Sequence, residues 1–174
     1  ECDAMSAPAL IKEMTGWASL EGQWLRRKHF TPDVLAAIAE RIRECEKDHE
    51  GELVVAIEAV SPVHERDSHL RALEVFGRLK VWDTPRNTGL LLYLALDRHR
   101  IEIIADRGID AGNHEWEAVC ERLQARLAAK NYAPGILAAI DDIESVMRRC
   151  CALTTSADTV AASDDGLAND PVLL

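Results

Sequence analysis

The sequence predicts an α/β protein, a three-layer αβα sandwich built around one small mixed sheet. Segments with apolar residues three or four positions apart alternate with short β-rich runs in the order α-β-α-β-β-α-α, which suits a small sheet between helix layers. One of these runs, residues 89–96, is apolar on both alternating faces, as is typical of a strand covered on both sides. A chain of 174 residues can bury one such core but not two.

The first helix of the domain is expected to begin at residues 31–33, Thr-Pro-Asp. The threonine hydroxyl can cap the helix, proline suits the first helical position, and aspartate favours the positive end of the helix dipole. The helix should end near His49, because Gly51 can adopt the left-handed conformation that closes a helix. Residues 52–60 form a β-rich run bounded by glycine and by Ser-Pro, and they are predicted to be a strand.

The rest of the domain is predicted in the same way, from helical spacing and from strand-like runs of apolar residues. A helix is expected over residues 68–80, and its side chains available to the core are Leu70, Leu73, Val75, Phe76 and Leu79. The polar quartet 97–100 is interpreted as a hairpin turn between two antiparallel strands. The remaining predicted elements are strands at 89–96 and 101–105 and helices at 113–130 and 134–149.

The domain is expected to cover residues 30–150, between a leader at 1–29 and a tail at 151–174. Within the leader, residues 9–25 have the spacing of an amphipathic helix. We favour docking of this helix and its two tryptophans on the domain itself over a membrane-surface anchor, because its polar side is not rich in Lys or Arg. The tail is rich in Ala, Ser, Thr, Asp and Gly, so we expect it to be disordered.

The acidic composition narrows the range of partners and compartments. Thirty acidic and 20 basic side chains give a net charge of -10, which repels phosphate backbones and anionic lipid surfaces. Five cysteines without a metal-binding spacing favour a reducing compartment, and no apolar run approaches the length that spans a bilayer. We therefore expect no nucleic-acid partner, no membrane span, and a cytoplasmic protein that reaches a membrane only through a partner.

Common catalytic signatures are absent from the sequence or wrongly spaced. His64 and His69 enclose a stretch that looks like the zinc-protease motif but is one residue too long, so on a helix the two rings would point about 140° apart. A nucleophile elbow, a P-loop, a dinucleotide-binding glycine motif and the Asp-x-Asp phosphatase pattern are also missing. The spacing offers neither an activated nucleophile nor a histidine–carboxylate pair, which favours a non-catalytic function.

Polar side chains gather where the predicted hairpin opens. The start of the first strand lies beside the end of the second in an antiparallel pair, so Asp83 and Asn87 can approach Asp106, whereas Asp97 lies at the opposite end. Carboxylate and amide oxygens are the ligands that Ca²⁺ and Mg²⁺ prefer, so these three residues are a candidate cation site. We favour the simpler interpretation, in which the aspartates cap turns or pair with a neighbour such as Arg107.

This stretch resembles the TPM-domain family, and the resemblance extends over about residues 30–150. It rests on the Trp-Asp-Thr turn at 82–84, on Gly89 before the apolar strand, and on the Asp-Arg-Gly exit at 106–108. The chain is most similar to the short bacterial members that lack transmembrane segments. Typical members have a second amide or its equivalent where this chain has Thr88.

The resemblance implies a TPM-like fold, divalent-cation binding and, as in the thylakoid members, acid phosphatase activity. We favour a non-catalytic or weakly cation-dependent interaction module, accessory to a membrane protein or an envelope complex. The alternative is an acid phosphatase that depends on Ca²⁺ or Mg²⁺. In that case Asp83 and Asp106 would act as metal ligands or as general acid and base, and Arg107 would steady the phosphate.

Overall fold

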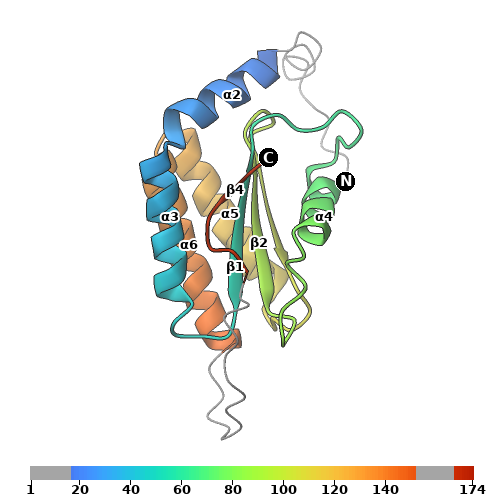
Figure 1. Ribbon diagram of the computed structural model, residues 1–174, viewed down its shortest axis with the longest axis vertical. Helices are drawn as coiled ribbons and strands as arrows, with labels where there is room; N and C mark the ends of the chain where they lie inside the picture. The colour runs from blue at the N-terminus through green and yellow to red at the C-terminus, as the bar shows by residue number, and fades with distance from the viewer. Residues whose placement is uncertain (1–16, 152–166) are drawn as a thin grey trace, which may run out of the picture.

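The computed structural model describes residues 17–151 and 167–174. In this part of the chain a four-stranded mixed sheet lies between helices, which confirms the predicted α/β sandwich (Figure 1). The helices are α2 (Trp17–His29), α3 (Pro32–Cys45), α4 (Ser68–Arg78), α5 (Asn113–Ala128) and α6 (Tyr132–Cys150). The strands are β1 (Glu52–Glu58), β2 (Gly89–Ala95), β3 (Arg100–Ala105) and β4 (Val172–Leu173).

The sheet has the strand order β3-β2-β1-β4. β1 and β2 run parallel, with Val54 opposite Leu91, and the connection between them contains α4. β2 and β3 form the predicted antiparallel hairpin, with Leu91 opposite Ile104. β1 and β2 are therefore the inner strands, and each has a hydrogen-bonded neighbour on both sides.

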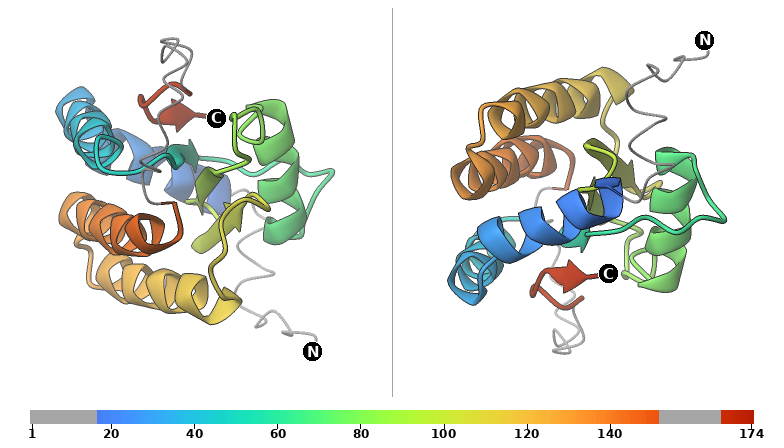
Figure 2. Two further views of the ribbon diagram at one scale, coloured as in Figure 1. Left: turned by 90° about the horizontal axis from the view of Figure 1, so that it is seen from below. Right: turned by 90° about the horizontal axis from the view of Figure 1, so that it is seen from above.

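Helices cover both faces of the sheet. α3, α5 and α6 lie on one face and α4 lies on the other (Figures 1 and 2). Leu90, Leu92 and Leu94 of β2 belong to the larger apolar cluster, on the side of α3, α5 and α6. Leu91 and Tyr93 belong to the smaller cluster, on the side of α4. None of these five residues is more than 1% exposed, so β2 is covered on both faces as predicted.

α3 ends at Cys45, earlier than the predicted end at His49. Gly51 does not adopt the left-handed conformation on which that prediction relied. The ring of His49 is instead held on both sides after the helix has ended. Its Nδ1 atom accepts a hydrogen bond from the Gly51 N–H (3.0 Å), and its Nε2 atom bonds to Glu144 Oε2 (2.6 Å).

α4 turns only part of the predicted apolar face to the sheet. Val75 is buried, and Phe76 and Leu79 pack against the smaller apolar cluster, as predicted. Leu70 and Leu73 are instead 51% and 43% exposed, and Arg71 is buried. The cause is an ion pair, because the Arg71 guanidinium binds the carboxylate of Glu58 in β1. A charged side chain that is buried in this way requires a charged partner, and here that requirement sets the rotation of the helix.

α2 lies across the end of the sheet where β1 and β2 finish (Figure 1). The predicted helix covered residues 9–25, whereas α2 continues to His29 and includes the basic residues 26–28. Residues 1–16 of the predicted leader lie outside the described residues.

α2 docks on the domain through small and aliphatic residues. Ala18 and Leu25 are buried, but Trp24, one of the two tryptophans expected to dock, is 55% exposed. The helix backbone comes very close to the end of β1 at Gly22, where a Cβ atom would lie 1.8 Å from the carbonyl oxygen of Ala59. A glycine is therefore required at this contact.

The prediction of a disordered tail is wrong for residues 167–174. β4 pairs in parallel with β1, and the Leu174 N–H donates to the carbonyl oxygen of Ile57 (3.0 Å). Val172 and Leu174 pack against the smaller apolar cluster. The prediction relied on the average composition of the tail and overlooked that its last four residues, Pro-Val-Leu-Leu, can cover an unpaired strand edge. The intervening residues, 152–166, lie outside the described part.

Candidate functional site

The β2–β3 hairpin opens at the lower end of the sheet in Figure 1, where β2 begins and β3 ends. We call residues 83–88 and 106–108 the hairpin mouth. Two backbone hydrogen bonds bring its halves together: the Gly108 N–H donates to the carbonyl oxygen of Asn87 (2.8 Å), and the Asp106 N–H donates to that of Gly89 (2.9 Å). Asn87 therefore lies beside the segment that contains Asp106, as antiparallel pairing requires.

Asp106 has one satisfied and one unsatisfied carboxylate oxygen. Its Oδ1 atom accepts a hydrogen bond from the Arg107 N–H (2.7 Å). Among the described residues, its Oδ2 atom is the one buried side-chain oxygen or nitrogen without a hydrogen-bond partner. A buried polar atom without a partner costs about 1–3 kcal/mol. A cation or a hydrogen-bond donor at Oδ2 would remove that cost.

The loops of the mouth are packed backbone against backbone. Asn87 has a φ of 56°, in the left-handed region that asparagine tolerates better than most residues. Its Oδ1 atom accepts a hydrogen bond from Nη2 of Arg107 (3.2 Å), an exposed residue. A Cβ atom on Gly108 would lie 2.2 Å from the carbonyl oxygen of Arg86, so glycine is needed for the two loops to approach this closely.

Asp83 lies apart from this arrangement. It is exposed, its N–H donates to the carbonyl oxygen of Lys80 (2.8 Å), and its carboxylate has no hydrogen bond or ion pair among the described residues. The same residues contain no group of three or more His, Cys, Asp or Glu side chains that could hold a metal ion. Of the three predicted ligands, the structure brings together Asn87 and Asp106, which are linked through Arg107.

Asp97 lies at the other end of the hairpin, as predicted, and there it binds another segment of the chain. Its carboxylate accepts hydrogen bonds from the Ser61 N–H (2.8 Å) and the Ser61 hydroxyl (2.7 Å). These bonds tie the β2–β3 turn to the chain that follows β1. The role of Asp97 is therefore structural.

The structure also contains a buried histidine–carboxylate pair that the sequence spacing did not reveal. Since His49 Nδ1 accepts the Gly51 N–H, its Nε2 atom must carry the proton that is donated to Glu144. Glu144 also accepts a hydrogen bond from Arg148 Nε (2.6 Å). Burial, with Glu144 nearby, raises the pKa of the Cys45 thiol to about 12. Cys45 is therefore no thiolate nucleophile at neutral pH, so the pair does not serve to activate this thiol.

A second buried polar network joins β1 to α4. The Glu58 carboxylate, in a residue only 3% exposed, binds the Arg71 guanidinium (2.6 and 3.1 Å) and accepts a hydrogen bond from the Tyr93 hydroxyl. Burial and this hydrogen bond raise the pKa of Tyr93 well above its ordinary value. A glutamate at the end of an otherwise apolar run is the sequence signal that could have indicated the network.

The fold and the mouth define an αβα sandwich domain whose polar hairpin mouth lies at one end of the sheet. The model of the TPM domain matches residues 26–146, and the chain belongs to the TPM-domain family. Among solved structures, it is similar to the NMR structure of the BA42 protein from the psychrophilic bacterium Bizionia argentinensis, with a TM-score of 0.69 and 25% sequence identity. That similarity covers 83% of this chain and 94% of the BA42 chain.

Curated proteins gave no match to this chain. Across residues 17–151 and 167–174, no helix combines the length and the apolar character needed to cross a membrane.

Proposed function

We propose that this TPM domain is a non-catalytic interaction module whose hairpin mouth binds a divalent cation, Ca²⁺ or Mg²⁺. The observation that carries the proposal is the buried Oδ2 atom of Asp106, which has no partner among the described residues. Both cations prefer oxygen ligands, and a cation beside this oxygen would offset its desolvation. The Asn87 side-chain oxygen would supply a second ligand, and water would complete the shell.

Arg107 makes this binding weak. Its guanidinium already occupies the Asn87 Oδ1 atom (3.2 Å), so an arriving cation must displace a positive charge from one of its own ligands. Removing that charge should therefore strengthen cation binding. In the proposed site Arg107 and the cation compete for Asn87, and this competition sets the cation affinity.

The module would bind its partner through the surface around the mouth. Trp82 is 49% exposed and directly precedes the exposed Asp83. Exposed tryptophans are enriched among the residues that dominate protein interfaces. The partner that we propose, in line with the family resemblance, is the extramembrane part of a membrane protein or an envelope complex.

Titration with Ca²⁺ and with Mg²⁺, followed by backbone amide NMR, tests the proposal. We expect the amides of Asn87, Asp106 and Gly108 to shift together and the melting temperature to rise, because a ligand that binds only the native state stabilises it. Asp106→Asn should abolish both effects, whereas Asp110→Asn, a charge-matched control outside the mouth, should not. Scattered small shifts on all acidic surfaces would contradict the proposal.

Two further variants sharpen this titration. Asp83→Asn decides whether the exposed carboxylate, which the sequence placed in the ligand set, takes part once the cation is present. A weakened affinity would show that the turn at residues 82–84 closes onto the cation. Arg107→Gln should tighten binding by removing the competing charge.

A cation-dependent acid phosphatase is the second candidate, and the exposed guanidinium of Arg107 at the mouth favours it. Arg107→Gln separates the two candidates through turnover, because a phosphatase would lose the group that steadies the phosphate and therefore lose activity. Intrinsic activity should also fall well over tenfold in Asp106→Asn. We expect residual turnover to be unchanged in Asp106→Asn, which would assign it to a contaminant.

A further inference from the structure

A pocket of about 610 Å³ lies at the end of the sheet opposite the hairpin mouth. Its walls come from α2, from the β2–β3 turn and from the connection between α5 and α6. A volume of this size suits a small organic ligand. No residue of the hairpin mouth lines this pocket, so it is separate from the proposed cation site.

The inner surface of the pocket is aliphatic. Five large aliphatic side chains from α2, β2, the β2–β3 turn, β3 and α5 contribute to its lining. They are Leu25, Leu94, Leu96, Ile101 and Leu127. All five belong to the larger apolar cluster or pack against it, so the pocket reaches down to the core of the domain. A flexible hydrocarbon chain is the kind of ligand that this surface would cover.

The lining also carries positive charge, although the whole protein has a net charge of -10. Three Lys or Arg residues and one Glu line the pocket, which leaves a local excess of two positive charges with the histidines neutral. The basic residues are Lys28, Arg100 and Lys130, and the acidic one is Glu21. Glu21 lies 3.4 Å from the His99 ring. A basic pocket on an acidic protein attracts an anionic group.

The aromatic rings of the pocket argue against a planar ligand. Lys28 Nζ lies 4.3 Å from the centre of the Trp24 ring. His29 stacks on Tyr132, with 4.1 Å between ring centres and 20° between ring planes. One face of each of these three rings is thus already covered by another side chain of the protein. A ligand that needs to stack between two free rings, such as a nucleobase, fits these walls less well than a hydrocarbon chain does.

We propose that this pocket binds a single amphipathic anion, an aliphatic chain that ends in a carboxylate or a phosphate. The aliphatic chain of the ligand would lie against the leucine-rich inner surface of the pocket. Its anionic head would pair with Lys28 and Lys130, which are exposed at the rim. The ligand is a free molecule rather than a bilayer surface, since the overall negative charge of the protein repels anionic membranes.

Calorimetric titration of the full chain with dodecanoate, dodecyl phosphate and dodecanol, each below its aggregation concentration, tests the proposal. Saturable one-to-one binding of at least one anion is expected, with amide shifts at Leu25 and Leu94. The neutral alcohol should bind at least about tenfold more weakly, which corresponds to about 1.4 kcal/mol. The two anions distinguish a carboxylate from a phosphate head. Equal binding of dodecanol, or no binding of either anion, would overturn the proposal.

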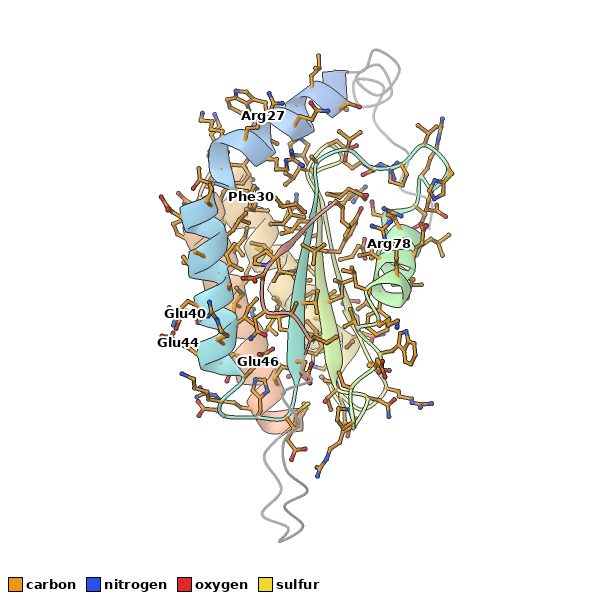
Figure 3. All side chains as sticks on the ribbon, viewed as in Figure 1. Arg27, Phe30, Glu40, Glu44, Glu46 and Arg78 are labelled. Atoms are coloured by element: carbon orange, nitrogen blue, oxygen red, sulfur yellow. The ribbon has the colours of Figure 1, made fainter. Side chains whose placement is uncertain are left out.

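Variants on and beside the pocket provide the matched comparison. Lys28→Gln and Lys130→Gln should each weaken anion binding about fivefold, as expected for one partly exposed ion pair. Arg27→Gln makes the same charge change on the same helix (Figure 3). Arg27 is not part of the pocket lining, so this variant should have no effect. Equal effects of Arg27→Gln and Lys28→Gln would mean that only the net charge of the protein matters.

Steric closure of the pocket gives a readout that does not depend on charge. Ala128 lines the pocket from the end of α5 and is exposed, so Ala128→Trp should block entry. An unchanged NMR spectrum outside the pocket would show that the variant is folded. If it is not folded, Lys130→Glu replaces it as the blocking variant, by repelling the anion. Undiminished binding to the folded blocking variant would place the ligand elsewhere.

Discussion

Arg71 of α4 and Glu58 of β1 form a two-point ion pair across the core, with 2.6 Å from Nη2 to Oε1 and 3.1 Å from Nε to Oε2. The two residues are 5% and 3% exposed. Both charges are therefore removed from water. The Glu58 carboxylate has Arg71 as its countercharge, whereas Arg71 also pairs with Glu74, whose side chain is 45% exposed (2.7 Å). The Tyr93 hydroxyl adds a third polar group to the pair, from the neighbouring strand β2.

Replacing one residue of this pair should lower the free energy of unfolding more than replacing both. Arg71→Met leaves the Glu58 carboxylate buried without its countercharge and should lower the free energy of unfolding by about 3–5 kcal/mol. The double variant Glu58→Leu/Arg71→Met should recover part of that loss, because no unpaired buried charge remains. Urea denaturation of the two single variants and the double variant measures the coupling. Additive losses would show that the residues stabilise the protein independently.

Stability should also depend on pH through Glu46, which lies at the end of α3 (Figure 3). Burial raises its pKa from 4.5 to about 7, against the hydrogen bond that it accepts from the Leu53 N–H. The folded state therefore binds more protons than the unfolded state between these values, and the contribution of Glu46 to stability falls as pH rises from about 4.5 to 7. Glu46→Gln should flatten this part of the pH profile, as measured by thermal unfolding.

The control for Glu46 is Glu44→Gln, an exposed glutamate on the same helix (Figure 3). It changes the net charge equally but should leave the slope between these pH values in place. If both variants flatten the profile to the same extent, the pH dependence comes from overall charge.

The two faces of β2 should be equally sensitive to truncation. Leu91 and Leu92 are both 0% exposed, but they point into different apolar clusters. Leu91→Ala and Leu92→Ala should each cost about 2–5 kcal/mol, through lost burial and the cavity left behind. Chemical denaturation measures both. A nearly neutral Leu91→Ala would mean that α4 does not seal its face of the sheet.

The C-terminal strand gives a matched pair of neighbouring residues. Val172 packs against the smaller apolar cluster, whereas Leu173 is 42% exposed. Val172→Ser should cost about 1–2 kcal/mol from lost apolar burial, and Leu173→Ser should be close to neutral. Denaturation of the full chain carrying each variant tests this difference. Equal effects would indicate that β4 stabilises the sheet only through its backbone.

The spacing of apolar residues along the sequence was sufficient to predict the elements that are buried on all sides. Residues 89–96 are apolar without interruption because β2 is an inner strand covered on both faces. The buried face of α4 was predicted only in part, for a non-local reason. Leu70 and Leu73 have the apolar spacing but are exposed, and the contact between Arg71 and Glu58 buries Arg71 instead. Periodicity within one helix cannot encode the charge on the strand it covers.

The candidate site was predictable at the level of backbone pairing and not at the level of side chains. Antiparallel register brings Asn87 to the segment of Asp106, as the sequence indicated. Asp83 lies elsewhere because the chain reverses just before it, with a left-handed φ of 55° at Lys80 and a hydrogen bond from the Asp83 N–H to the Lys80 carbonyl. A lysine carries no sequence signal for that conformation.

Gly22 has opposite effects on the formation of α2 and on its docking against the sheet. A glycine inside a helix lowers its intrinsic stability by about 1 kcal/mol relative to alanine. Any side chain at position 22 would favour the helix and yet push it away from Ala59, where a Cβ atom has no room. Since α2 forms one wall of the basic pocket, the depth of that pocket depends on the absence of a single methyl group.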